Sequence, residues 1–186
     1  MTRRLRTGLG LAALVATLPF AGWWEAGLVR HVLGQIPLLV AAGVLLAPRV
    51  GRPVSQPTAI AAILAAVFCI AFWMIPRWLD GAVNSRMVDV VKMASLVLLA
   101  GMPAGWAWPH LAPLTRGFVL AQLASMFGIL GSIWLVAPVR LCNNYLVNEQ
   151  TVLGRLALAV GVTMVVAGLV AALAGRGFMR TRSPAA

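Results

Sequence analysis

The chain is poor in the residues on which most soluble catalytic sites depend. It has four acidic side chains, two histidines, two cysteines and one tyrosine among 186 residues. With so few carboxylates and imidazoles, few residues could form a general acid–base pair or a metal-binding cluster. No GxSxG, Walker A or HExxH pattern occurs, so the sequence predicts neither a hydrolytic triad nor a phosphate-binding loop. We therefore expect that this chain alone is not an enzyme.

Apolar residues, by contrast, are abundant. The hydrophobic share is 61% and the mean hydropathy is +0.93, against an apolar share of about 45 to 50% in soluble domains. This composition predicts a polytopic membrane protein in a lipid bilayer. The net charge is +11, but the basic residues lie at the ends of apolar runs, which argues against nucleic-acid binding. Cys69 lies in an apolar run and Cys142 in a connection, so no disulfide is expected.

Six apolar runs, each near the ~20 residues that cross a bilayer, predict an all-α bundle of six transmembrane helices. Residues 1–26 have the layout of a signal peptide, but Pro19, Trp23 and Trp24 crowd the cleavage sites. We therefore expect a retained helix there, and five helices if it is cleaved. The bundle is expected over 27–176, with a basic tail at 177–186. The other five predicted spans are His31–Ala47, Thr58–Met74, Met87–Trp108, Gly117–Val136 and Thr151–Ala174.

The distribution of lysine and arginine predicts the orientation of these spans. With the amino terminus in the cytoplasm, nine basic side chains lie inside and six outside, in the direction of the positive-inside rule. The same topology puts all four acidic residues at the outer end and the carboxyl terminus in the cytoplasm. We expect a bacterial cytoplasmic membrane as the location.

Charged side chains interrupt the apolar pattern between residues 77 and 92. A charge at the centre of a bilayer costs roughly 2.5 to 3.5 kcal/mol on insertion scales, so such residues are usually paired and often functional. Asp89 and Lys92 share one helix face, and His31 and Gln35 share another. We expect a charged cluster at the outer end, either as a ligand, metal or proton site or only as pairs that anchor a loop. Its predicted members are Arg77, Asp80, Asp89, Lys92 and Glu149.

Metal ligands are scarce near this surface. His31, with Met74 and Met87, is the candidate set, because imidazole and thioether suit Cu(I). Methionine at helical spacing is more often core filler, so copper is a candidate cofactor and no cofactor is certain. His31 and His110 should lie at opposite ends of a hydrocarbon core of about 30 Å and cannot share one haem iron.

Three blocks of the sequence together carry a family resemblance. They are HVLGQIPLLVAAGVLLAP (His31–Pro48), WMIPRWLDGAVNSRMVDVVKMASLVLLAG (Trp73–Gly101) and NEQTVLG (Asn148–Gly154), about a third of the chain. Their order and spacing resemble the cytochrome c oxidase assembly factor family called CtaG, multi-helix membrane proteins associated with copper-site maturation. The resemblance implies a role in the assembly of a haem-copper or related respiratory oxidase, or as its accessory subunit, with oxidase subunits as partners.

The chain departs from the family pattern at most candidate copper ligands. The resemblance implies a second histidine where Gln35 stands, and a histidine pair where Asp89 and Lys92 stand. A protonated lysine does not bind copper, so Lys92 would take the place of a cation and neutralise Asp89. We therefore expect a CtaG-like fold whose metal role is reduced or lost.

A second function, from a different class, stays open. Trp73, Trp78 and Met87 would offer apolar walls beside the charged groups, as in a quinone- or small-molecule-binding subunit of an electron-transfer complex. A transporter is less favoured, because no repeated halves with mid-membrane sites are visible.

Overall fold

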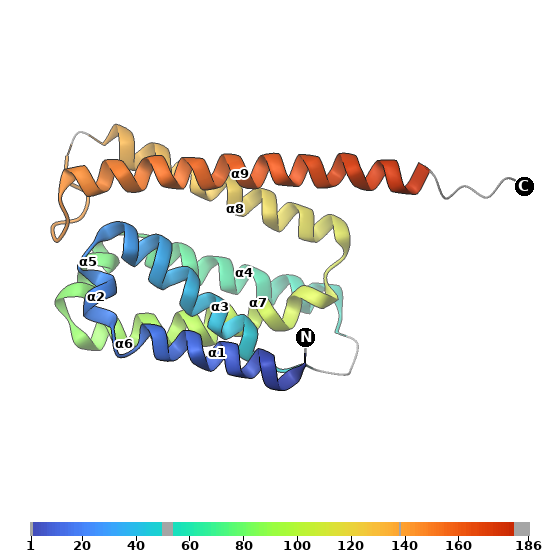
Figure 1. Cartoon of the computed structure of the whole chain (residues 1–186), viewed down its shortest axis with the longest axis horizontal. Coiled ribbons are helices and arrows are strands. Elements are labelled where there is room, and N and C mark those ends of the chain that lie inside the picture. Colours follow the sequence, from blue (N-terminus) through green and yellow to red (C-terminus); the bar gives the residue numbers. More distant parts are fainter. Residues whose placement is uncertain (1, 50–53, 138, 181–186) are drawn as a thin grey trace, which may run out of the picture. The chain divides into compact units, whose positions relative to one another are not determined.

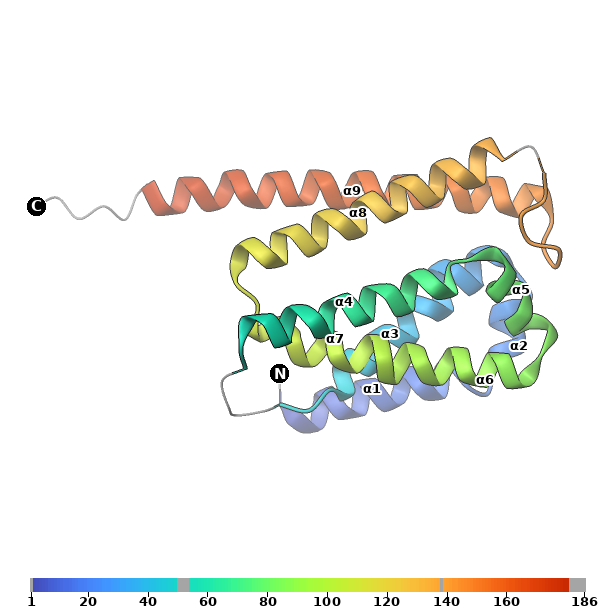
Figure 2. The same cartoon turned by 180° about the vertical axis from the view of Figure 1, so that it is seen from behind.

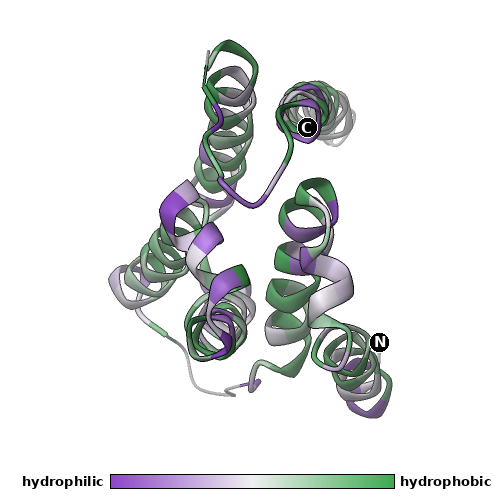
Figure 3. Ribbon diagram, turned by 90° about the vertical axis from the view of Figure 1, so that its left-hand side faces the viewer, coloured by the Kyte–Doolittle hydropathy of each residue, from purple (hydrophilic) through white to green (hydrophobic). Residues whose placement is uncertain are grey.

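The computed structural model describes residues 2–49, 54–137 and 139–180, and every regular element in these ranges is a helix. The all-α class is thus confirmed. Length and composition allow four helices to cross a membrane, and the six-helix count is not confirmed. They are Gln56–Trp73, Arg86–His110, Pro113–Val136 and Val147–Leu173, with a shorter apolar helix at Arg30–Leu46. Figure 3 colours much of each helix as hydrophobic, with hydrophilic residues on some helical turns as well as in connections.

The chain forms two compact units. Unit 1 comprises Met1–Ala112 and Pro138–Gln150, and unit 2 comprises Pro113–Ala137 and Thr151–Ala186. The loop between the last two helices therefore belongs to unit 1, although it lies far along the sequence from the rest of that unit.

The first predicted span is broken near its end. α1 (Arg3–Thr17) is followed by a turn and by the short helix α2 (Ala21–Glu25). Pro19 lacks a backbone donor, which explains why one helix does not run through. The indole N–H of Trp24 donates to the carbonyl oxygen of Ala16 at 2.9 Å and ties α2 back to α1. As a result the Glu25 side chain is turned into unit 1, where the residue is 8% exposed.

Two segments of unit 1 form wider, π-helical turns. η1 (Arg30–Gln35) leads into α3 (Ile36–Leu46), and η2 (Leu96–Gly101) connects α6 (Arg86–Ser95) to α7 (Met102–Ala107). Pro37 and Pro103 each stand two residues after the last residue of one of these turns. A proline ring clashes with the carbonyl four residues earlier in a regular α-helix, and a wider turn relieves that clash. η1 carries His31 and Gln35, both fully buried.

The core of unit 1 is a close crossing of α3 with the continuous helix α6, η2 and α7. A Cβ atom added to Gly43 would lie 2.7 Å from the Cα of Gly101, and one added to Gly105 would lie 2.7 Å from the Cα of Val44. Such close backbone approach is how membrane helices pack when lipid removes the hydrophobic drive. α4 (Gln56–Trp73) packs on the other side of η2 and α7, as Figure 2 shows. The 3-10 turn η3 (Trp108–His110) ends this layer.

The segment after Trp73, expected to be a connection, is partly helical. α5 (Pro76–Asn84) begins with Pro76 at its first position, where a missing N–H does no harm. Leu79 and Ala82 are buried on one face and hold the helix against unit 1. It lies between the predicted spans Thr58–Met74 and Met87–Trp108, and its apolar face stabilises a short amphipathic helix there.

Unit 2 contains two long antiparallel helices, α8 (Pro113–Val136) and α9 (Val147–Arg180). They meet closely at Gly131 and Gly154. α9 extends to Arg180, so the first part of the predicted tail, 177–180, is helical. Residues 181–186 of that tail lie outside the described ranges.

Candidate functional site

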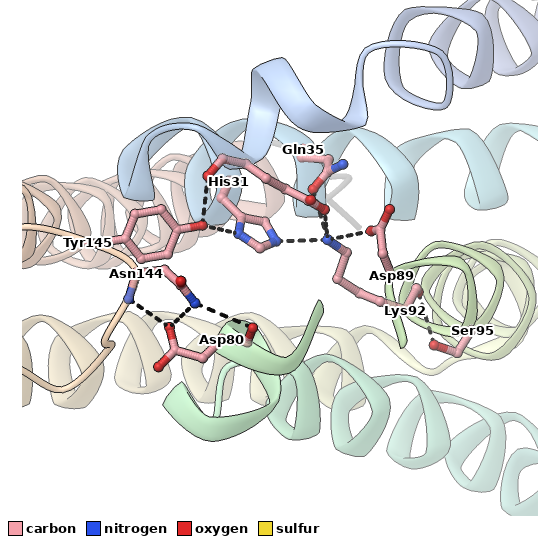
Figure 4. Close-up of polar contacts among 9 residues, drawn as sticks. His31, Gln35, Asp80, Asp89, Lys92, Ser95, Asn144 and Tyr145 are labelled. Atoms are coloured by element: carbon pink, nitrogen blue, oxygen red, sulfur yellow. Dashed lines mark hydrogen bonds and ion pairs between the residues drawn. The ribbon is translucent and has the colours of Figure 1, made fainter. Parts of the chain in front are cut away.

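Lys92 lies at the centre of a buried polar cluster in unit 1. Its side chain is 0% exposed, and its ammonium donates to Glu25 Oε1, to His31 Nε2 at 2.8 Å and to Gln35 Oε1 at 3.2 Å. Asp89 Oδ1 lies 2.9 Å from the same nitrogen. Figure 4 shows His31 and Gln35 of η1, and Asp89 of the same helix α6, pointing toward Lys92.

The hydrogen bonds account for all three ammonium protons. Glu25, His31 and Gln35 each accept one. Asp89 Oδ1 is therefore an ion-pair partner without a hydrogen bond of its own, although it is close enough for a strong attraction. The Nε2 amide donor of Gln35 is also buried without a partner. This N–H donor has no partner because the rotamer of Gln35 directs the amide oxygen toward Lys92.

A one-directional chain of hydrogen bonds continues from Lys92 through His31. An ammonium can only donate, so His31 Nε2 accepts and the ring proton is assigned to Nδ1. That Nδ1–H donates to the Tyr145 hydroxyl at 2.7 Å, and the hydroxyl donates to the backbone carbonyl of Glu25 at 2.9 Å. Both ring nitrogens of His31 are thus engaged within the protein, and the imidazole is held neutral in one tautomer.

The charges of the cluster do not cancel if both carboxyl groups are ionised. Glu25 and Asp89 would then carry two negative charges against the single positive charge of Lys92. Glu25 is the last residue of α2, which follows the apolar run of the first predicted span and is not among the helices long and apolar enough to cross a membrane. Burial raises the pKa of its carboxyl to about 7, the neighbouring Asp89 carboxyl acts in the same direction and Lys92 opposes both. One proton held by Glu25 leaves the cluster neutral.

The loop of unit 1 that precedes α9 closes this cluster from the outside. The Asp80 carboxylate accepts the backbone N–H groups of Asn143 at 2.7 Å and Asn144 at 3.3 Å, and the Asn144 side chain at 3.1 Å. Figure 4 shows Asp80 and Asn144 beside Tyr145. By fixing this turn, Asp80 holds the Tyr145 hydroxyl against His31. Cys142 lies in the same loop, and burial raises the pKa of its thiol to about 12.

The predicted cluster residues separate into groups. Asp89 and Lys92 meet with His31, as described, whereas Asp80 binds the loop. Glu149 accepts the backbone N–H of Leu146 at 3.3 Å and caps the start of α9. Arg77 is exposed on α5.

Two important members of the cluster were not among the predicted site residues. Glu25 is one of only four acids, and Tyr145 is the single tyrosine of the chain. Their scarcity was a signal that could have directed attention to them. Their sequence distance from Lys92 gave no indication that they would meet.

The arrangement does not fit a copper ion. The ammonium of Lys92 fills the position between the donors, and neither nitrogen of His31 is available. Within the part of the chain that the structure describes, no three His, Cys, Asp or Glu side chains are placed to hold a metal. Met87 is 78% exposed. Copper at His31 with Met74 or Met87 stays a prediction that requires His31 to release Lys92 or Tyr145.

A cavity of about 590 Å³ lies beside the cluster, between α1 and α6. Its walls are mostly apolar, and two charged residues, Arg86 and Asp89, line one part of it. Because Asp89 also pairs with Lys92, the cavity reaches the edge of the buried cluster. The other lining residues include Leu14, Leu18, Met93 and Val97.

Comparison with protein families, curated proteins and solved structures found no match to this chain. The resemblance to CtaG proteins therefore depends on the three sequence blocks alone.

Proposed function

We propose that the protein is a CtaG-like integral membrane protein that helps to assemble a haem-copper or related respiratory oxidase, or remains with it as an accessory subunit. The proposal includes a bacterial cytoplasmic membrane, six spans and a cytoplasmic carboxyl terminus. It assigns no catalysis to the chain and no resident copper to the cluster.

The observation that supports this proposal is the environment of Lys92. An imidazole nitrogen, two carboxyl groups and an amide oxygen surround one ammonium, which is a set of donors that a metal ion would also accept. His31 and Gln35 come from the first block of resemblance, and Asp89 and Lys92 from the second. A copper-handling protein that lost its metal would need another positive group to keep these donors paired. The ammonium of a lysine in the position of the metal ion meets that need.

In this role the cluster acts as a rigid support. Glu25, His31 and Lys92 join α2, η1 and α6, and Tyr145 joins the last loop to them. A surface built on these elements keeps a fixed shape, as a docking partner requires. Buried ionic groups are costly unless fully paired, so their near-complete satisfaction supports a selected arrangement.

The test is recovery of the protein from its native membranes. The full chain carrying an affinity tag would be extracted in a mild detergent, and the co-purified proteins identified together with the optical spectrum of haem. We expect respiratory oxidase subunits in the eluate, and less assembled oxidase in membranes that lack the chain. Unchanged oxidase content in those membranes, with no respiratory subunit in the eluate, would contradict the proposal.

Two variants distinguish the contribution of the buried cluster to oxidase recovery from that of an exposed charge. Lys92→Met is expected to lose the recovery of oxidase, whereas Arg77→Gln, which removes an exposed cation, is expected to keep it. Stoichiometric copper that disappears in His31→Ala would overturn the metal-free assignment and favour direct copper handling.

A second function, binding of a quinone or another small amphiphile, is favoured by the cavity between α1 and α6. Its apolar walls with two convergent charged groups are typical of a ligand pocket. Solvent extraction of the purified protein would be followed by mass spectrometry of the extract. A quinone that is retained by the wild type and absent from Ala94→Trp, in which the cavity is filled, would favour this function over the first.

A further inference from the structure

Two adjoining cavities lie at the end of unit 1 where α1 begins. One of about 380 Å³ is lined by α1 and by the end of α3, and the other, of about 300 Å³, by the end of α3 and by α7 and η3. They share Arg6, Pro48 and Arg49. Figure 1 shows the start of α1 and the end of α3 close together at this end. Arg3 lines the first cavity, and Trp106 and His110 line the second.

The arginines of these cavities have no carboxylate to balance them. Neither cavity is lined by an acidic residue. All four acidic side chains of the chain are engaged elsewhere: Glu25 and Asp89 with Lys92, Asp80 with the loop, and Glu149 at the start of α9. From His31 to Leu46 the helix rises by roughly 20 Å, which is well beyond a Debye length of about 8 Å at physiological salt. The carboxylates of the buried cluster therefore do not neutralise these arginines.

One of the arginines is fixed in place by the fold. The Arg6 guanidinium donates to the backbone carbonyl of Ala47, which follows α3. Arg6 is half-buried, whereas Arg3 and Arg49, which line the same cavity, are exposed. Three guanidinium groups around one cavity, one of them fixed, offer several N–H donors to an anion. Guanidinium groups bind phosphate with paired, parallel hydrogen bonds.

We propose that these two cavities bind the headgroup of an anionic phospholipid, with its phosphodiester against Arg3, Arg6 and Arg49. Basic pockets between transmembrane helices on the cytoplasmic side are suited to such headgroups. Trp106 lines the second cavity and is of the residue type that lies at the membrane interface. The site rests on the proposed membrane topology, but it does not depend on the buried cluster or on the proposed role in oxidase assembly.

Arginine footprinting tests the site on the unaltered protein. The full chain would be reconstituted in vesicles of phosphatidylcholine alone or with phosphatidylglycerol, treated with phenylglyoxal and mapped by mass spectrometry. We expect phosphatidylglycerol to slow modification of Arg3 and Arg49 several-fold, and not that of Arg4, which is exposed on α1 but lines neither cavity. Equal protection of Arg4 would overturn the proposal, because it would indicate diffuse attraction to the surface.

Charge-matched variants give a second measurement. Native mass spectrometry of the delipidated protein would count bound phosphatidylglycerol in Arg3→Gln/Arg49→Gln and in Arg4→Gln/Arg155→Gln, which lose the same charge. We expect the affinity to fall more than about tenfold in the first pair and to be kept in the second, on the scale of arginine–lipid attraction. Equal losses would contradict the proposal, as would equal binding of phosphatidylcholine. Displacement of the lipid by millimolar inorganic phosphate would show a free-phosphate site instead.

Discussion

Replacement of Lys92 by methionine is the sharpest perturbation of the buried cluster. The side chain keeps most of its volume, but the ammonium that joins Glu25, His31, Gln35 and Asp89 is lost. Two carboxyl groups then face one another without a cation in a site from which water is largely excluded. Removing one partner of a buried ion pair costs about 3 to 5 kcal/mol, or roughly a hundredfold to a few thousandfold in the ratio of folded to unfolded protein.

The assay is unfolding in mixed detergent with increasing sodium dodecyl sulfate, followed by the fluorescence of the seven tryptophans. The triple variant Glu25→Gln, Asp89→Asn, Lys92→Met removes all three charges. We expect it to be more stable than the single variant, because no charge is left unpaired. The exposed Arg77→Met serves as a control and should change the free energy of unfolding by no more than about 0.5 kcal/mol.

The expected order of stability is wild type, then the triple variant, then Lys92→Met. The loss in Lys92→Met should also shrink as the pH falls from 8 to 5, because uptake of a proton by Glu25, whose pKa burial raises to about 7, removes the repulsion between the two carboxylates. If the triple variant were as unstable as the single one, and acid gave no recovery, unpaired charge would not be the cause. The reasoning from the cluster would then be refuted in favour of a packing effect.

Three further predictions concern other parts of unit 1. Burial raises the pKa of Glu25 from 4.5 to about 7 on folding. The contribution of the Glu25 proton to stability is therefore full below pH 4.5 and is lost as the pH rises through 7. The midpoint of thermal unfolding should fall over this range, and less so in Glu25→Gln. Cys142 is 1% exposed and its pKa is raised to about 12, so maleimide should not label the thiol at pH 7.5 until the protein is denatured. Asp80→Ala, which frees the loop, should permit labelling. Rapid labelling of the wild type would contradict the loop contacts. Gly43→Ala should lower the free energy of unfolding by about 1 to 3 kcal/mol because the new methyl group meets the opposing backbone, and Gly8→Ala, which meets nothing within 4 Å, should not.

The helical architecture could be predicted because hydropathy over windows of about 20 residues carries it. α4 and α8 lie within a few residues of their predicted spans. The break after α1 could not be placed, because proline is tolerated within membrane helices when neighbours satisfy the freed groups. α5 was missed for a related reason. Its helicity depends on packing against unit 1, which local sequence does not contain.

The candidate site was predictable only where helical spacing fixes it. The pairing of Asp89 with Lys92 follows from a separation of three residues, and the shared face of His31 and Gln35 from a separation of four. That Lys92 Nζ would lie 2.8 Å from His31 Nε2 depends on how η1 and α3 pack against the continuous helix α6, η2 and α7. Helical spacing could not predict the position of Tyr145, because Asp80 fixes that residue through loop contacts.

The late position of Tyr145 in the chain implies an order of events during biosynthesis. Lys92 is synthesised more than fifty residues before Tyr145. During that interval its charge is offset by Asp89 on the same helix and by the already synthesised Glu25, while His31 lacks its hydroxyl partner. The imidazole thus acquires its second hydrogen-bond partner, and with it a fixed tautomer, only after the loop that carries Tyr145 has been made.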